Sequence, residues 1–433
     1  PEICYPVVKK IVYFFHKAPL EKRETVSNIL SYTWAMIPKL LIILFSLFFK
    51  FLNTPEPQSA IILLQNNHEL RATGGFMGSY AKIEQGPTIS IQDIYVPDGQ
   101  LPGHVEPPLA IQQAFSQGWY KLRDANWEPN FPTSAQTIRW FLEKGKEINP
   151  DVLITINLST IENILSITGP IGIDSLGLTL EPDNISLILQ NQIKQNFFPG
   201  STNKKDLLTS LSQSLTNKLS SLNTRQKLKV AHLLYQDLKN QDILINSQDP
   251  KLQTFLEKRN WAGQLTKTTC KKCLSDTIAI IESNLGSNKA NAFITRHTTH
   301  TILKNAAITH QITIDYKNTS PSEDPDPPYH HGGNYINYLR FFIPTSATNI
   351  QASKDFSLNT KYGFQELAFF HTTPHQSTSS VNISYEIPVT NQKTYQLSIL
   401  KQSGIGESPQ TINLFNKSQE INLTQDITYS TPL

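Results

Sequence analysis

Two polar segments carry the residue types that could bind a charged ligand. The first, Gln65–Gly75, follows a short apolar run, and the second is Arg123–Trp127. Arginine pairs bidentately with phosphate or carboxylate groups, and glycines let the backbone approach a ligand closely. The candidate ligand-binding residues in these segments are Asn66, Asn67, Glu69, Arg71, Arg123, Asp124, Asn126 and Trp127.

The same residues also fit a purely structural role. Arg71 can pair with Glu69, and Arg123 with Asp124, to hold two long loops in place. The residues alone leave both alternatives open. The sequence contains no G-x-S-x-G elbow, no phosphate-binding P-loop and no G-x-G-x-x-G motif, so we assign no catalytic residue.

Cys270 and Cys273 are the chain's single C-x-x-C pair. A structural zinc site needs two further ligands, which His297 and His300, or His330 and His331, would have to supply. A local disulfide and two free thiols are the alternatives, and a disulfide would fit an oxidising compartment.

The elements that must position the two polar segments form an α/β pattern over residues 56–180. It consists of a strand at Ala60–Leu64, a hairpin of Phe76–Ile83 with Thr88–Val96, a helix from Thr133 to Lys144, and a strand at Asp151–Asn157 with a helix to Thr168. Polar groups at the carboxyl end of a buried strand often line a ligand crevice in such folds. We therefore expect the first polar segment at that position.

The remainder of the chain predicts two further regions. Residues 181–275 read as a helical insertion, with a leucine stripe from Leu207 to Leu222 that indicates a core face. Residues 276–433 contain short strands separated by turn-rich linkers, which predict an Ig-like β-sandwich. The expected fold class is therefore α+β and multidomain.

The first 55 residues form a basic and apolar segment. Seven basic and three acidic residues lie within the first 50, around an apolar run from Leu40 to Phe49. Tyr32–Leu52 has about the length of a membrane span, with its basic flank on the cytoplasmic side. Because Lys39 lies near its middle, a packed or membrane-surface helix is the alternative.

The composition limits the class of protein. Charged residues make up 17% of the chain and the formal net charge is +3. A nucleic-acid binder would show a concentrated basic face, so we expect no nucleic-acid partner. A surface of uncharged polar residues fits the extracytoplasmic face of a cell membrane.

Several long motifs resemble, in order, the family called domain of unknown function 4012. They include Leu64–Tyr80, Asp98–Pro108, Arg123–Ala135, Asn196–Thr202, Glu282–Asn291 and Tyr316–Pro321. The resemblance extends over roughly residues 60 to 400. It implies a bacterial cell-surface protein, commonly anchored by a transmembrane helix near its N-terminus, and it brings no established activity.

The order of strand, arginine, hairpin, helix and strand also resembles the core of the LytR–CpsA–Psr phosphotransferases. That resemblance implies that Arg71 and Arg123 hold a lipid pyrophosphate, with Asp93, Asp98 or Asp124 as ligands of a divalent cation. The chain departs from the family's Arg–Ser–Asp–Thr arrangement, because Arg71 is followed by Ala72-Thr73-Gly74. A cation is expected only if the transferase hypothesis holds.

Three functions therefore remain open. The first is a membrane-anchored cell-envelope protein that binds a surface component, such as a lipid-linked or cell-wall glycan. The second is a phosphotransferase that moves a polyprenyl-pyrophosphate-linked glycan onto a cell-wall acceptor. It requires both arginines and an acidic residue at the mouth of an apolar groove. The third is a structural or adhesion module, which predicts an exposed aromatic or apolar patch on residues 300–433.

Overall fold

The computed structural model describes residues 59–433 except 85–88, 174–176, 187, 189–202 and 324–330. The fold is α+β, as the sequence predicts. Tyr32–Leu52, the segment expected to contact a membrane, lies outside the described residues. Within the described part, no helix combines the length and apolar content that a bilayer crossing requires.

A five-stranded sheet organises the N-terminal part. Its strands are β1 (Ala60–Arg71), β2 (Gly74–Ile83), β3 (Ile89–Asp93), β4 (Val152–Asn157) and β7 (Ile243–Ser247). They lie in the order β3-β2-β1-β4-β7, and β1 runs parallel to β4 and antiparallel to β2. Side chains alternate between the two faces of a strand, so Ile61 and Leu63 point to one face and Ile62 and Leu64 to the other.

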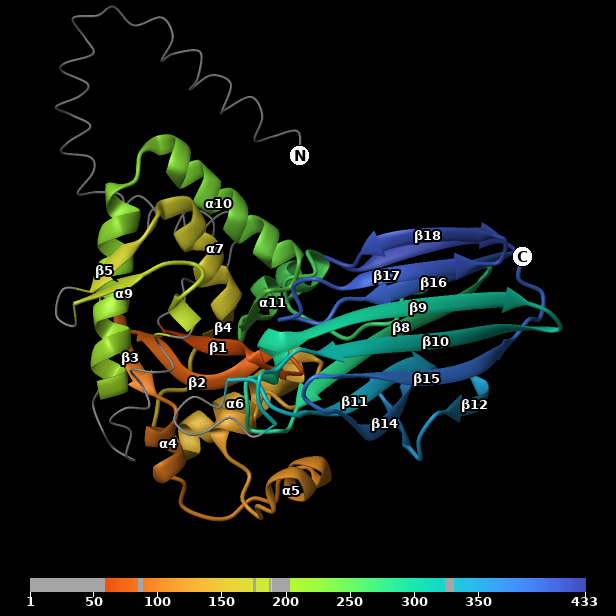
Figure 1. Ribbon diagram of the computed structural model, residues 1–433, viewed down its shortest axis with the longest axis horizontal. Helices are drawn as coiled ribbons and strands as arrows, with labels where there is room; N and C mark the ends of the chain where they lie inside the picture. The colour runs from red at the N-terminus through yellow and green to blue at the C-terminus, as the bar shows by residue number, and fades with distance from the viewer. Residues whose placement is uncertain (1–58, 85–88, 174–176, 187, 189–202, 324–330) are drawn as a thin grey trace, which may run out of the picture. The chain divides into compact units, whose positions relative to one another are not determined.

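Helices cover both faces of this sheet. The helices of this part are α4 (Tyr95–Gly99), α5 (Leu109–Phe115), α6 (Phe131–Lys144), α7 (Leu158–Thr168), α9 (Asn203–Ser221), α10 (Thr224–Lys239) and α11 (Pro250–Lys258), with a 3₁₀ turn η1 (Leu122–Asp124). Helix α6 packs against fully buried Ile61 and Leu63 through Ile138 and Phe141. Helices α7 and α9 lie over the opposite face, with α9 beside β3 and the small hairpin of β5 (Ile171–Ile173) and β6 (Leu178–Leu180) (Figure 1).

Two expectations for this part need correction. The strand predicted at Ala60–Leu64 continues to Arg71, with register shifts after Leu64 and Asn66, so Gln65–Arg71 of the first polar segment forms the second half of β1 instead of a loop. Residues 181–275 are not purely helical, because Ile243–Ser247 pairs with β4 and completes the sheet. The pairing partner of a five-residue strand is set by tertiary contacts, which local periodicity does not reveal.

The C-terminal part consists of two six-stranded sheets. One contains β12 (Thr348–Ala352), β15 (Ser377–Pro388), β10 (Ala307–Asn318), β9 (Ile294–Lys304), β17 (Pro409–Leu414) and β18 (Lys417–Asn422). The other contains β13 (Ser357–Lys361), β14 (Phe364–Thr373), β11 (Tyr335–Pro344), β8 (Cys273–Asn284), β16 (Thr394–Leu400) and β19 (Ile427–Pro432). Their inward side chains share one core, as in a β-sandwich.

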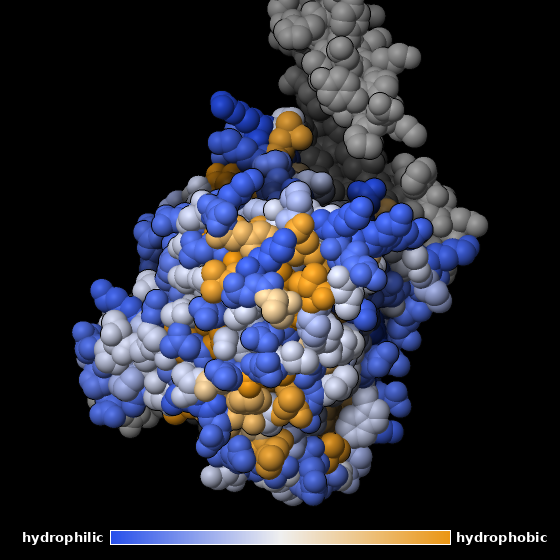
Figure 2. Space-filling view, turned by 90° about the vertical axis from the view of Figure 1, so that its right-hand side faces the viewer, coloured by the Kyte–Doolittle hydropathy of each residue, from blue (hydrophilic) through white to orange (hydrophobic). Residues whose placement is uncertain are grey.

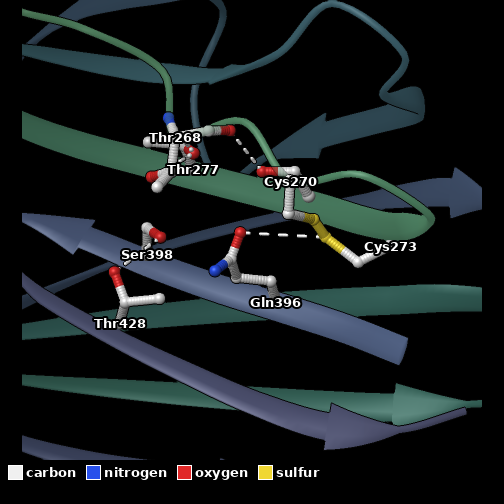
Figure 3. Close-up of a disulfide and its surroundings, with 8 residues drawn as sticks. Thr268, Cys270, Cys273, Thr277, Gln396, Ser398 and Thr428 are labelled. Atoms are coloured by element: carbon white, nitrogen blue, oxygen red, sulfur yellow. Dashed lines mark hydrogen bonds between the residues drawn. A yellow bond between two sulfur atoms is a disulfide. The ribbon is translucent and has the colours of Figure 1, made fainter.

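Cys270 and Cys273 form a disulfide at the start of β8, with Cα atoms 5.7 Å apart (Figure 3). Sγ of Cys273 lies 3.8 Å from Oε1 of Gln396 on the neighbouring strand β16. The pairing selects one of the alternatives that the sequence left open and removes these thiols as zinc ligands.

Candidate functional site

The main candidate site is a cavity of about 880 Å³ between the five-stranded sheet and helices α7 and α9. Its size lies within the range typical of small-molecule sites. One wall is formed by the sheet, a second by apolar helix side chains, and one end by charged residues.

The sheet wall follows directly from strand register. Leu64 is paired with Ser79 on β2 and with Ile156 on β4, and Ser79 is paired with Asp93 on β3. Directly opposed residues share a face of a sheet, so these four residues form one row across the cavity side. Leu64 and its neighbour on this face, Ile62, remain only half-buried, whereas the side chains on the opposite face are fully buried.

The helix wall is mainly apolar along about three turns of α9, with Ser212 and Thr216 between the leucines. Its apolar lining side chains are Leu208, Leu211, Leu215 and Leu219, joined by Leu158 and Ile161 of α7. The sequence predicted the α9 stripe to be core. In the structure the stripe does pack on apolar clusters, with Leu207 and Leu211 buried against α7 and the β5–β6 hairpin and Leu208, Leu215 and Leu219 partly buried beside them. Leu208, Leu211, Leu215 and Leu219 also line the cavity.

Arg71 lies at the charged end of the cavity and is itself buried. Its Nη2 is 3.0 Å from Glu69 Oε1, and its Nη1 donates to the carbonyl oxygens of Leu70 and Asn284. Lys289, from the C-terminal part, approaches the other carboxylate oxygen of Glu69 at 3.4 Å. Glu69 is therefore held between two cations that both line the cavity.

Arg123 completes this end from the 3₁₀ turn η1, which precedes α6. Its Nη1 lies 3.2 Å from Asp98 Oδ2, and its Nε lies 3.8 Å from Asp124 Oδ2. Its guanidinium lies over the Tyr95 ring at 5.1 Å, as that of Arg71 lies over Phe76 at 5.4 Å. Both aromatic rings line the cavity.

The carboxyl groups at this end differ in the direction in which their pKa is shifted. Burial raises the pKa of Asp124 above its ordinary value although Arg71 and Arg123 both oppose the shift. Burial also raises the pKa of Asp98, against the charge of Arg123. For Glu69 burial acts in the same direction, but Lys289 and Arg71 outweigh it and the net pKa is lowered. Glu69 is thus the firmly ionised carboxylate of the three.

Three buried side-chain oxygens of the described cavity lining make no hydrogen bond. They are Gln65 Oε1, Ser79 Oγ and Asn157 Oδ1. A buried polar atom without a partner costs about 1–3 kcal/mol. Gln65 Oε1 and Asn157 Oδ1 both lie beside Gly74, whereas Ser79 belongs to the row that faces the cavity. A polar ligand atom or a water molecule in the cavity would therefore remove the cost at Ser79 Oγ.

The predicted candidates divide into two groups. Asn66, Glu69, Arg71, Arg123 and Asp124 all line the cavity. The ion pairs of the structural alternative are present, and both arginines also line the cavity, so the ligand-site alternative stays a prediction.

The other three candidates serve packing contacts. Asn67 donates to the carbonyl of Gly404, and Asn126 donates to the carbonyl of Gly75. Trp127 stacks on Tyr338 of the sandwich, 5.4 Å between ring centroids, with Arg340 4.5 Å from its ring centre. None of the three is among the cavity-lining residues.

The proposed cation ligands do not form a cluster. Asp98 is engaged by Arg123 and by the backbone N–H of Leu122, and Asp93 accepts a hydrogen bond from the backbone N–H of Tyr95. Among the described residues, no group of three or more His, Cys, Asp or Glu side chains is placed to hold a metal ion.

The histidines considered as zinc ligands have other partners. His300 is fully buried and hydrogen-bonds His310, while His297 hydrogen-bonds Thr411. His331 lies 4.9 Å from the Phe293 ring, and His330 lies outside the described residues.

Sequence reasoning missed Lys289, Ser79 and the cavity-facing leucines of α9. Lys289 lies within the quoted Glu282–Asn291 motif, whose density of asparagines was the available signal. The leucine stripe of α9 was identified from the sequence, but only the packing shows that several of its side chains line the cavity.

A family model described as Protein of unknown function (DUF4012) matches residues 56–193. This range contains the motifs from Leu64 to Ala135, and the later motifs of the resemblance lie outside it. No curated protein matches the sequence.

Solved structures share only low similarity with the chain. The transcriptional regulator yvhJ from Bacillus subtilis is 12% identical, with 51% of this chain and 86% of that chain covered and a TM-score of 0.28. Protein gbs0355 from Streptococcus agalactiae is 14% identical, with 47% and 74% covered and a TM-score of 0.30. A putative nutrient binding protein (lpg2210) from Legionella pneumophila is 9% identical, with 32% and 55% covered and a TM-score of 0.24, so the match spans about half of its length. Such scores do not establish a shared fold.

Proposed function

We propose that this chain, which over residues 56–193 belongs to the DUF4012 family of proteins of unknown function, binds a lipid-linked anionic component of the cell surface. The hydrocarbon part would occupy the apolar length of the cavity, and the anionic head group would lie at Arg71 and Arg123. In this proposal the protein is a membrane-anchored cell-envelope protein that acts on the extracytoplasmic face.

The observation that carries the proposal is one cavity with an apolar wall and a cationic end. Each CH₂ group moved from water into an apolar site contributes about 0.8 kcal/mol, so a long chain can supply most of the affinity. Each charge-assisted hydrogen bond to the head group adds about 1.5–3 kcal/mol. A short polar ligand would leave the α9 leucines in contact with water.

The disulfide gives independent support for the location. Disulfides persist in oxidising compartments and are rare in the cytosol. Cys270 and Cys273 are paired in the structure. Tyr32–Leu52 remains the proposed membrane contact.

The experiment is a comparison of two leucine variants of the full chain. Leu215→Asp places a charge on the cavity wall, whereas Leu228→Asp changes an exposed leucine of the neighbouring helix α10. We expect geranylgeranyl phosphate to bind the wild type and Leu228→Asp equally, and Leu215→Asp at least tenfold more weakly by titration calorimetry. Lipid extracts of the purified proteins, analysed by mass spectrometry, should show the same order. Equal binding by both variants would exclude this cavity as the lipid site.

A phosphotransferase is the second candidate, and one observation favours it. The charges of Arg71 and Arg123 both act on Asp124, so two guanidinium groups and a carboxyl group meet at the end of the apolar cavity. An acceptor hydroxyl would attack the phosphorus next to the glycan and release a polyprenyl phosphate, while a base takes the hydroxyl proton. Incubation with a polyprenyl-pyrophosphate-linked glycan and magnesium should then release polyprenyl phosphate, and binding without release would leave only the first function.

The adhesion alternative has weaker support. Figure 2 shows the end of the sandwich, where hydrophobic residues form separate small groups among hydrophilic ones. Within the described part of residues 300–433, the exposed large hydrophobic side chains are Leu303 and Leu358, which lie on different sheets. Such scattered side chains are ordinary for a soluble surface.

A further inference from the structure

We infer that the β-sandwich part supplies a direct head-group ligand, Lys289, so that an anionic head group in the cavity bridges the two parts of the described chain. This inference rests on the proposed function and deepens it. It assigns a role to the Glu282–Asn291 motif, which the cavity lining alone does not explain.

The position of Lys289 is the first line of support. It lies in the connection between β8 and the 3₁₀ turn η3 (Ala290–Phe293), and it lines the cavity together with Ser287. Its side chain is 12% exposed, and its Nζ lies 3.4 Å from Glu69 Oε2. Lys289 and Arg123 therefore line the same cavity although more than 150 residues separate them along the chain.

The asparagines of the motif fix the loop that carries Lys289. Asn284 Nδ2 donates to the backbone and side-chain oxygens of Asn288 and to Oδ1 of Asn291. Asn288 Oδ1 accepts from the backbone N–H of Ala290, and its Nδ2 donates to the carbonyl of Asn334. A lysine on a loop held in this way loses little further freedom when it contacts a ligand.

The loop is also joined to the cavity end of β1. Asn291 Oδ1 accepts from the backbone N–H of Leu70, and Arg71 Nη1 donates to the carbonyl of Asn284 at 2.5 Å. Lys289 and Arg71 are therefore held in one framework, on either side of Glu69.

The charges around the cavity end favour an anionic ligand. Three cations, Arg71, Arg123 and Lys289, line it with two carboxyl groups, Glu69 and Asp124, and a third carboxyl group, Asp98, pairs with Arg123 from outside the lining. Burial raises the pKa of Asp98 and of Asp124, which favours their uncharged forms and leaves the cations in excess. The neighbouring His68 adds no charge at neutral pH, because burial and then the charges of His331 and Lys289 lower its pKa to about 4. The pKa of His331 is also lowered, by burial and by Lys289. Glu69 pairs with Lys289 in the free protein, and a head group with more negative charge can take over part of that pairing.

The test uses two probes of different charge, geranylgeranyl diphosphate and geranylgeranyl monophosphate, titrated into the full chain. Loss of a charged hydrogen bond weakens binding about tenfold or more. We expect Lys289→Gln to weaken diphosphate binding about tenfold and monophosphate binding less, and Lys289→Arg to retain most of the affinity. Lys304→Gln, a control at an exposed lysine of β9, should bind as the wild type does.

A double variant separates contact from disturbance of the site. Lys289→Gln leaves Glu69 with Arg71 alone, which could weaken binding through added repulsion. In Glu69→Gln/Lys289→Gln that repulsion is absent, so binding that stays weak supports direct contact, and full recovery overturns it. Hydrogen exchange gives a second readout, because the diphosphate should protect the amides of 284–291 in the wild type and not in Lys289→Gln.

The outcomes for the two proposals differ. If the wild type binds neither probe, the proposed lipid site is itself wrong. If the wild type binds and Lys289→Gln binds equally well, the lipid site stands and the role of Lys289 is overturned.

Discussion

Nη1 of Arg71 donates a 2.5 Å hydrogen bond to the carbonyl oxygen of Asn284, although 213 residues separate them in the chain. A side chain at the cationic end of the cavity therefore also joins the five-stranded sheet to strand β8 of the sandwich. If the proposed head group lies at Arg71, binding and stability are coupled at this residue, so variants of Arg71 must be measured for both.

Arg71→Ala should be strongly destabilising. It removes the guanidinium that pairs with Glu69 and leaves two carbonyl groups without this donor. Breaking a buried ion pair costs about 3–5 kcal/mol. Urea unfolding of the wild type, Arg71→Ala and Arg71→Lys measures the change, and an Arg71→Ala variant as stable as the wild type would show that the pair contributes nothing.

Gly404→Ala tests the contact between the β16–β17 loop and the start of β2. Gly404 has a φ of +82°, and a Cβ there would lie 2.8 Å from the Cα of Gly74. Strain and overpacking together should cost about 1–3 kcal/mol. Gly406→Ala is the matched control, since its Cβ would meet nothing within 4 Å. Thermal unfolding of both variants should show a loss for the first alone.

Asp237 should make stability depend on pH. It lies buried on α10, and burial raises its pKa to about 6. Because the folded pKa lies above the unfolded value, the folded state holds the proton more tightly, and stability falls as pH rises from about 4 through about 6. The loss is at most about 3 kcal/mol.

The variant Asp237→Asn should therefore be more stable than the wild type at neutral pH and should vary less across that range. Urea unfolding at several pH values measures both effects. Asp355→Asn, at an exposed position, should follow the wild type. A wild-type slope that persists in Asp237→Asn would assign the pH dependence to another group.

Asp124 should make anion binding depend on pH. Its pKa is already raised by burial, and a bound anion would raise that pKa further. Binding then takes up a proton, so affinity should fall as pH rises through the pKa of Asp124. Decanesulfonate below its micellar concentration is a suitable probe because its charge is constant over this range.

Asp124→Asn should bind decanesulfonate more tightly than the wild type and with less pH dependence. Calorimetric titration at several pH values provides the comparison. If both proteins show the same dependence, the anion does not lie beside Asp124.

The elements with strong local patterns were predictable from the sequence. The hairpin of β2 and β3, helix α6, and the succession of β4 and α7 all follow from short-range periodicity and from turn residues. Arg71 and Arg123 were identified because an arginine beside glycine-rich or aromatic segments can be recognised from residue types alone as a candidate ligand of an anion. Strand β1 was predicted too short because its polar second half is buried only by distant partners.

Tertiary structure alone decided where these residues meet. The sequence determined that Glu69 and Arg71 lie two positions apart, but Lys289, 220 residues further on, reaches Glu69 only when the β8–η3 loop packs against β1. The leucines of α9 likewise read as core from their spacing; in the described structure they do pack on apolar clusters, and Leu208, Leu211, Leu215 and Leu219 also line a cavity. Periodicity reports which side of an element is apolar, while the space between two such sides depends on how distant segments pack.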